Sequence, residues 1–165
     1  MGQTIRILGI DPGLRRTGWG MIACEGNRLI YLACGTVETN EKLSLAERLV
    51  TIHDGLTRIV DEFRPDEAAV EVTFVNRDAV ATLKLGQARG IAMLVGAEAD
   101  LRVCEYKPMQ VKQAVHGYGL AKKEQVGEMV RVLLGLTAIP RPDDAADAAA
   151  IAICHLHTSH LDVLA

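Results

Sequence analysis

Apolar positions along this chain follow two periods, one typical of strands and one typical of helices. The first forty residues hold three apolar stretches, at 5–11, 17–24 and 29–37, whose length and bordering turn residues predict strands. Pro12-Gly13 follows the first stretch, and Gly26-Asn27 separates the other two as a short hairpin signal. We therefore predict that three consecutive antiparallel strands open the fold.

Helical spacing replaces the strand pattern over residues 45–63. Apolar side chains recur there three and four positions apart, which places them on one face of a helix. Ser44 immediately precedes this segment, and Glu47 lies three residues after Ser44. This spacing is the arrangement of a capping box at a helix start. Pro65 marks the end of the helix, because the residue before a proline is disfavoured in helical backbone.

Strands and helices alternate in the rest of the chain. Apolar stretches at 66–72 and 101–105 predict two strands, which enclose a helix predicted over 78–98. Gly86 and Gly90 lie inside that helix, where each costs about 1 kcal/mol relative to alanine, and close backbone packing would account for both. Further helices are predicted near 107–116, 122–134 and 143–158. This order indicates an α/β fold in one domain, 1–165, with helices on the faces of a mixed sheet.

Composition narrows the class of protein. The 165 residues include 49% apolar and 24% charged side chains, with a formal net charge of −3, as in ordinary globular domains. The start of the chain does not resemble a signal peptide, and no apolar run is long enough for a membrane span. The four cysteines form no C-x-x-C pair, and Cys154-His155-x-His157 lacks zinc-site spacing. We therefore expect a cytoplasmic protein with reduced thiols and no membrane contact.

Four carboxylates occupy positions that call for an explanation. Asp11 closes an apolar strand, and Glu71 lies in a stretch whose neighbours are apolar, where an unpaired charge is costly. Asp144 and Asp147 lie three apart at a helix start and so share one face. Each has a structural alternative: a turn-forming aspartate, a salt-bridged glutamate, or acids that favour a helix N-terminus. If the four converge, their charge requires cations, and oxygen ligands favour Mg²⁺ or Mn²⁺, a pair of which supports phosphodiester hydrolysis.

Basic residues gather in two segments although the total charge is negative. Residues 107–131 carry five basic against two acidic side chains, and residues 74–91 carry three against one. Both segments suit a phosphate-bearing substrate, although a solvated helix face is the better explanation for most single lysines. Phe74 lies between the Glu71 strand and a polar segment, so it is either an aromatic that stacks on an unpaired base or a core residue.

Four motifs occur in order at fitting distances: ILGIDPGLRRTGWG at 7–20, LKLGQARG at 83–90, QVKQAVHGYG at 110–119 and DDAADAAAIAICH at 143–155. They resemble the RuvC family of bacterial Holliday-junction resolvases over nearly the whole chain. The resemblance implies a ribonuclease H-like fold, which is a five-stranded mixed sheet flanked by helices. It also implies a homodimer that cuts two strands of a four-way DNA junction symmetrically in recombination and repair, with the RuvAB branch-migration complex as partner.

The resemblance also implies site residues. Two catalytic Mg²⁺ ions, or Mn²⁺ in their place, would be bound by the carboxylates of Asp11, Glu71, Asp144 and Asp147. Lys112 and Lys123 would contact junction phosphates or aid catalysis, and the LKLGQARG helix would form the dimer interface. The resemblance and the two basic segments together give the expected DNA contacts, which are Phe74, Arg77, Lys84, Arg89, Lys107, Lys112, Lys122 and Lys123. The chain departs from the family pattern at two positions. Val72 follows Glu71 where the family usually has a polar residue. Asp143 precedes Asp144, which leaves open which aspartate of that pair is the ligand.

Three other functions stay open on the sequence alone. DPG-x-x-x-T-G at 11–18 also resembles the first phosphate loop of actin-like ATPases, although those proteins combine two such subdomains in roughly 300 residues or more. Another ribonuclease H-like nuclease acting on RNA is the second alternative. The third is a module that binds junctions without cutting them, which the presence of all four carboxylates disfavours.

Overall fold

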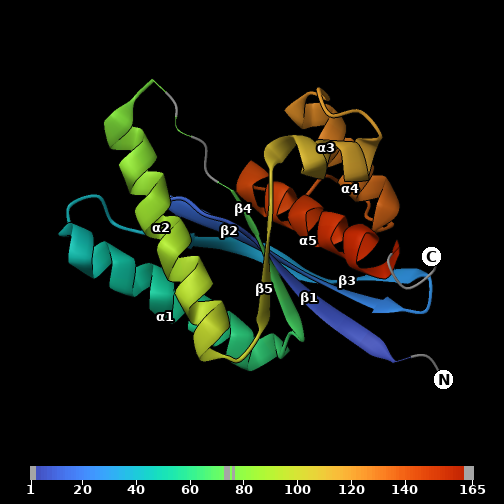
Figure 1. Ribbon diagram of the computed structural model, residues 1–165, viewed down its shortest axis with the longest axis horizontal. Coiled ribbons are helices and arrows are strands. Elements are labelled where there is room, and N and C mark those ends of the chain that lie inside the picture. The colour runs from blue at the N-terminus through green and yellow to red at the C-terminus, as the bar shows by residue number, and fades with distance from the viewer. Residues whose placement is uncertain (1–2, 73–74, 76, 162–165) are drawn as a thin grey trace.

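The computed structural model describes residues 3–72, 75 and 77–161. The strands of its central sheet (Figure 1) are Thr4–Asp11 (β1), Arg16–Glu25 (β2), Arg28–Glu38 (β3), Glu67–Glu71 (β4) and Arg102–Tyr106 (β5). The helices are Leu45–Phe63 (α1), Ala79–Glu98 (α2), Pro108–His116 (α3), Lys123–Leu133 (α4) and Asp143–Leu161 (α5). Every predicted element is therefore present, with ends within about three residues of those expected.

The sheet has the order β3-β2-β1-β4-β5. The first three strands pair antiparallel, whereas β4 pairs parallel with both β1 and β5. The five-stranded mixed sheet and its opening meander are thus confirmed. Ile10 pairs with Val70, so Asp11 and Glu71 are the next residues on two adjacent parallel strands.

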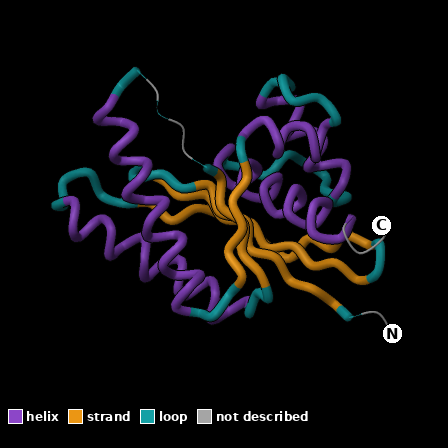
Figure 2. The backbone as a smooth tube through the Cα atoms, viewed as in Figure 1, coloured by secondary structure: helices purple, strands orange, loops and turns teal. Residues whose placement is uncertain are grey.

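Helices cover both faces of the sheet, as Figure 2 shows. One face packs Leu8 and Ile10 of β1 against α1 and α2, and the other packs Ile7 against α3, α4 and α5. Because successive side chains of a strand point to opposite faces, Asp11 lies on the same face as Ile7. The strand period therefore turns Asp11 toward α5.

Glycines on the strands let α5 lie directly on the sheet. A Cβ atom on Gly9 would stand 2.1 Å from the carbonyl oxygen of Ala148, and one on Gly18 would stand 2.0 Å from that of Asp144. On the helix side, the contacting residues are mostly alanines, from Ala145 to Ala152. Small side chains on both elements bring the helix backbone close to the strands, and this proximity sets the position of the acidic end of α5.

Gly86 and Gly90 of α2 differ from those glycines. A Cβ atom at either position would meet nothing within 4 Å among the described residues of the chain. Close packing inside the chain, one interpretation of these glycines, is therefore wrong. Across the described ranges, no helix combines the length and the apolar character of a membrane span. The assignment of 1–165 to one domain stays a prediction.

The capping box of α1 is present as predicted. Ser44 accepts a hydrogen bond from the backbone N–H of Glu47, whose carboxylate in turn accepts one from the N–H of Ser44. Arg64 ends the helix in the left-handed conformation before Pro65. Local sequence therefore defines both ends of this helix.

His53 joins α1 to α2, and we expect the link to depend on pH. Its Nε2 lies 2.7 Å from Glu98 Oε2 and its Nδ1 lies 3.2 Å from Asp54 Oδ1. The hydrogen bond with Glu98, and next that with Asp54, raises the pKa of His53 above 6.5. Charged His53 therefore stabilises the folded protein fully at pH values below its unfolded-state pKa, and this stabilisation is lost as the pH rises through its folded-state pKa. His53→Gln should lower the free energy of unfolding by about 0.5 kcal/mol near pH 5 and by almost nothing near pH 9.

Urea unfolding at the two pH values measures this difference. Glu98→Gln removes the main partner and should reproduce the effect, because the same ion pair is lost. An equal loss of stability at both pH values would assign His53 a packing role instead.

Candidate metal and nucleic-acid site

Three carboxylates from β1 and α5 meet beside the sheet. Asp11 ends β1, and Asp144 and Asp147 lie near the N-terminus of α5. One carboxylate oxygen of each residue lies within 4.8 Å of one from each of the other two. The convergence predicted for these three residues is therefore present in the fold.

Glu71 adds a fourth carboxylate from β4. Burial, followed by the negative charge of Asp147, raises the pKa of Glu71, while a hydrogen bond with Asp11 and the charges of two lysines oppose the rise. Glu71 and Asp147 line a cavity of about 290 Å³ together with Lys112 of α3 and Lys123 of α4. Five elements, from β1 near the start of the chain to α5 near its end, thus contribute to one site.

The electrostatics of the cluster show whether its residues fit a metal ion. Burial raises the pKa of Asp11 well above its ordinary value, and repulsion from Glu71, Asp147 and Asp144 adds to that rise. Burial also raises the pKa of Asp147, although its hydrogen bond to Lys123 opposes this. Carboxylates that repel one another in this way are stabilised by a cation, and an all-oxygen donor set suits Mg²⁺ or Mn²⁺. The residues therefore fit a divalent cation of this class.

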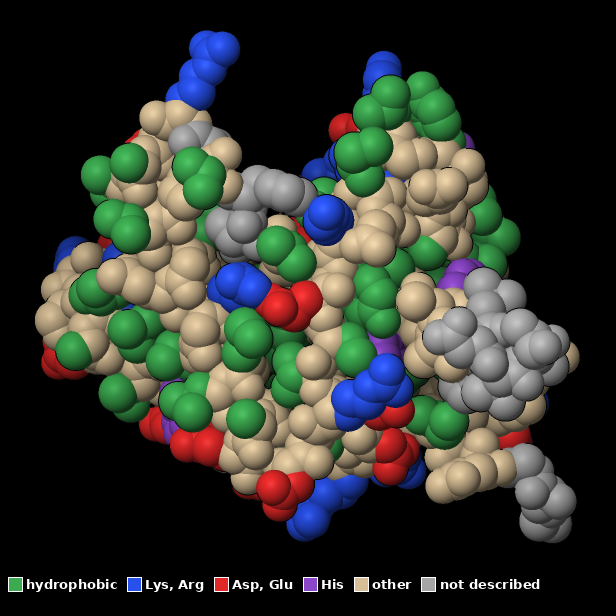
Figure 3. Space-filling view, in the orientation of Figure 1, with side chains coloured by type: hydrophobic (Ala, Val, Ile, Leu, Met, Phe, Trp, Pro, Cys, Tyr) green, Lys and Arg blue, Asp and Glu red, His purple; other side chains and the backbone are tan. Residues whose placement is uncertain are grey.

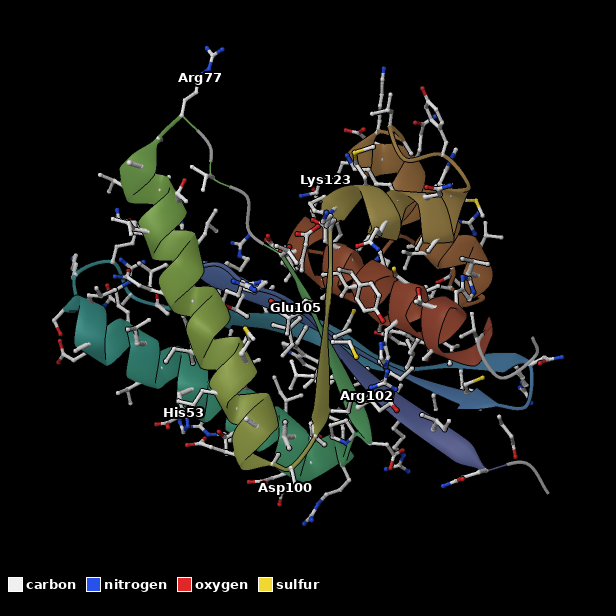
Figure 4. The ribbon with its side chains drawn as sticks, viewed as in Figure 1. His53, Arg77, Asp100, Arg102, Glu105 and Lys123 are labelled. Carbon is white, nitrogen blue, oxygen red and sulfur yellow. The ribbon has the colours of Figure 1, made fainter. Side chains whose placement is uncertain are left out.

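Lys123 brings a positive charge directly to the cluster. Its Nζ lies 2.9 Å from Asp147 Oδ2, and this hydrogen bond is the largest cause that raises the pKa of Lys123. Lys123 is the first residue of α4, which forms a lobe with α3 on the other side of the molecule from α2 (Figure 4). Lys112 lines the same cavity from α3. The structure thus brings both predicted lysines to the carboxylates.

The neighbours Asp143 and Asp144 have different surroundings. Asp143 is exposed and pairs with Arg141, whereas Asp144 belongs to the three-carboxylate cluster. The geometry therefore favours Asp144 over Asp143 as a metal ligand. The helix rotates the two side chains about 100° apart, so only one of them faces Asp11.

Arg16 lies at the site although the sequence did not single it out. Its Nη1 lies 3.5 Å from Asp144 Oδ2, and its Nε lies 3.0 Å from Glu38 Oε1. The one available signal was its place in the motif at 7–20, five residues after Asp11. Arg16 and Lys123 therefore pair with different aspartates of the cluster.

The predicted DNA-binding residues lie on two projections. Arg77 stands at the free end of α2 (Figure 4), and Lys84 is exposed on the same helix. Lys107 and Lys122 are exposed at the starts of α3 and α4. Figure 3 shows the surface hollowed between these projections, with basic side chains at their ends. Figure 1 identifies them as the end of α2 and the lobe formed by α3 and α4.

Arg89 and Phe74 are the other two residues predicted to contact DNA. Arg89 is only partly exposed, and its guanidinium pairs with Glu105 of β5. A DNA phosphate would have to compete with that carboxylate. Phe74 falls outside the described residues.

The histidines near the end of α5 contact the protein itself. His155 is fully buried, with its Nδ1 2.7 Å from the Tyr106 hydroxyl oxygen and its Nε2 against Glu67. His157 Nδ1 lies 3.1 Å from the carbonyl oxygen of Ala114. These contacts join α5 to β4, β5 and α3, on which the candidate site is also built.

Comparison with known proteins adds independent findings. A family model described as crossover junction endodeoxyribonuclease RuvC matches residues 7–155. The RuvC of Afipia carboxidovorans is 62% identical, covering 95% of this chain and 91% of its own length. The RuvC of Rhizobium meliloti is 58% identical, and the match covers 100% of this chain and 99% of its own length.

Solved structures show the same likeness. Thermus thermophilus RuvC in complex with a Holliday junction substrate is 38% identical, with a TM-score of 0.90 and 96% of each chain covered. The yeast mitochondrial Holliday junction resolvase Ydc2 is 14% identical with a TM-score of 0.71, which shows a shared fold.

Proposed function

The chain belongs to the RuvC family of crossover junction endodeoxyribonucleases, and we propose that it resolves four-way DNA junctions by metal-dependent hydrolysis at the site between β1, β4 and α5. The observation that carries this assignment of the site is the meeting of Asp11, Asp144 and Asp147 within 4.8 Å. Acidic residues alone are common on protein surfaces. Here they lie beside Glu71 and two lysines, Lys112 and Lys123, which line one cavity together with Asp147.

Asp11, Glu71, Asp144 and Asp147 would hold the metal, for which we propose two Mg²⁺ ions, with Mn²⁺ as the alternative. When bound, such ions lower the pKa of a water molecule and stabilise charge on the leaving oxygen of a phosphodiester. The protein contributes a rigid set of oxygen ligands from two strands and one helix. Lys112 and Lys123, which line the same cavity, would offset the negative charge of the scissile phosphate.

Junction DNA fits the hollow between α2 and the lobe of α3 and α4. Arg77 precedes α2 and Lys84 is exposed on it, while Lys107 and Lys122 are exposed at the starts of α3 and α4, so both of these parts supply cations. We extend the proposal to Arg89, after release from Glu105, and to Phe74 as a base-stacking residue. Backbone contacts of this kind give affinity without reading sequence.

A homodimer would supply the second cut. Val80, Leu83 and Leu94 are exposed apolar residues on α2, and Gly86 and Gly90 leave open space beside them. A second copy packed on α2 would cover these residues and account for both glycines. Action with the RuvAB complex and a cytoplasmic location are proposed from the family alone.

A junction-cutting assay tests the proposed function. Purified protein is incubated with a mobile four-way junction, a matched duplex and a matched RNA, with Mg²⁺ or with EDTA, and the products are separated on a denaturing gel. Paired nicks at symmetric positions, on the junction only and with metal only, support the proposal. Cutting of RNA alone would favour the RNA nuclease, and binding without any cutting would favour the non-cutting module.

Lys123→Ala should slow junction cutting by roughly 100-fold in single-turnover assays with Mg²⁺, because a charge facing the scissile phosphate is lost. The slope of log affinity against log salt should also become shallower by about one if Lys123 contacts a phosphate. Arg28→Ala is the matched control, since it removes an exposed charge where β3 begins, at the end of the hairpin far from Asp11. Equal effects of the two substitutions would remove Lys123 from the site.

A further inference from the structure

The segment 107–123 combines a positive charge with exposed apolar side chains, and the proposed function explains only the charge. It contains four lysines and no aspartate or glutamate. It also exposes three large apolar side chains: Met109 is 60% exposed, Tyr118 57% and Leu120 67%. We call Met109, Tyr118 and Leu120 the apolar tip.

The loop that carries the tip is held in place by the protein. Gly117 ends α3 with φ +82°, a backbone conformation that favours glycine, and its N–H donates to the carbonyl of Gln113. The N–H of Ala121 donates to the carbonyl oxygen of Tyr118 at 3.1 Å, and the Ala121 side chain is buried in the core. A fixed loop therefore holds Tyr118 and Leu120 out into solvent.

The loop also lies close to Met109, at the start of α3. A Cβ atom on Gly119 would be 3.6 Å from the carbonyl oxygen of Met109 and 3.7 Å from its Cε. Met109 therefore lies next to the loop that carries Tyr118 and Leu120. All three side chains are more than half exposed, whereas Ala121, which follows them, is buried.

The tip is joined to the carboxylate site by a short segment. Leu120 precedes Lys123 by three residues, and Lys123 pairs with Asp147. The lobe of α3 and α4, which carries the tip, also borders the hollow that Figure 3 shows. The tip is therefore placed to contact a part of the DNA near the cut.

Charge indicates which partner the tip fits. Lysine is depleted at protein–protein interfaces, whereas apolar side chains flanked by cations are typical of proteins that insert between or against bases. We propose that the apolar tip packs against exposed bases of the junction arm next to the cut, with Tyr118 stacked on one of them, while Lys107 and Lys122 hold the backbone. This inference rests on the proposed function and adds a base contact to it.

Junction affinity and its salt dependence test the contact. In EDTA, where no cutting occurs, Tyr118→Ser and Leu120→Ser should each weaken binding of a four-way junction by about tenfold, the loss expected for one stacked or packed base. The salt slope should stay that of the wild type, because no phosphate contact is removed. Lys122→Ala should instead make the slope shallower. Val132→Ser, at an apolar residue 54% exposed on α4, is the matched control and should bind as the wild type does.

A fluorescent base locates the contact. Junctions with 2-aminopurine at single positions on either side of the cut should show quenching by wild-type protein at one or more arm positions, and Tyr118→Ser should abolish it. Unchanged affinity and quenching in both tip variants, with a wild type that binds and cuts, would overturn this inference alone. A wild type that neither binds nor cuts junctions would overturn the proposed function as well. Circular dichroism of each variant verifies folding, which exposed residues should not alter.

Discussion

Asp11→Asn should lower the rate of junction cutting by at least about 1,000-fold while junction binding stays within about twofold of the wild type. The change keeps the shape of the side chain but removes one negative oxygen ligand from a set in which three carboxylates lie within 4.8 Å. The remaining residues would bind the metal more weakly and in a shifted position. Asp11 lies at the base of the site and not on the basic projections, so backbone contacts with DNA should persist.

The measurement is a single-turnover cutting rate with Mg²⁺ beside a binding titration in EDTA. Asp143→Asn is the matched control, because that carboxylate is adjacent to Asp144 in sequence but pairs with Arg141 outside the cluster. The control should cut within a few fold of the wild type. Robust cutting by Asp11→Asn, or its loss in Asp143→Asn, would refute the ligand assignment. The melting temperature of Asp11→Asn in EDTA should not fall, because the substitution relieves repulsion among the acids.

Gly9→Val should destabilise the protein by about 3 kcal/mol or more, and it should abolish cutting as well. Even the first added carbon would stand 2.1 Å from the carbonyl oxygen of Ala148 and 2.7 Å from the backbone N of Ala152. Backbone atoms of a helix cannot rotate away as a flexible side chain does, so α5 must move as a unit. Its movement would separate Asp144 and Asp147 from Asp11.

Urea unfolding gives the loss of stability, and the junction assay gives the loss of cutting. Gly119→Ala serves as the control for the stability measurement alone, since its added methyl group would meet its nearest neighbour at an ordinary 3.6 Å. A Gly9→Val protein with wild-type stability would show that α5 does not rest on the strands as described. If the variant does not fold, the milder Gly9→Ala gives the same comparison, because the clash begins at the Cβ atom.

Local features of the sequence were enough for the elements and their order. The signals used for the strands were apolar stretches bordered by turn residues, and those for the helices were apolar spacing and the capping box from Ser44 to Glu47. Each of these signals involves neighbours within a few residues, and the elements were found where predicted. Their positions in the predicted elements, and then the motif resemblance, singled out Asp11, Asp144 and Asp147, which the fold brings together. The same resemblance led to the RuvC family, which the family model matches over residues 7–155.

Only the tertiary structure decided the contacts between distant segments. Arg16 and Asp144 lie 128 positions apart, and no pattern within a short window reports that they pair. The choice of Asp144 over Asp143, and the pairing of Arg89 with Glu105, depend on which side of a helix faces another element. The sequence alone determined where strands and helices form, and it singled out the residues that we propose carry the chemistry. The packing of α5 on glycine-bearing strands determined how those residues meet, because a site built from five elements depends on distances that no single element contains.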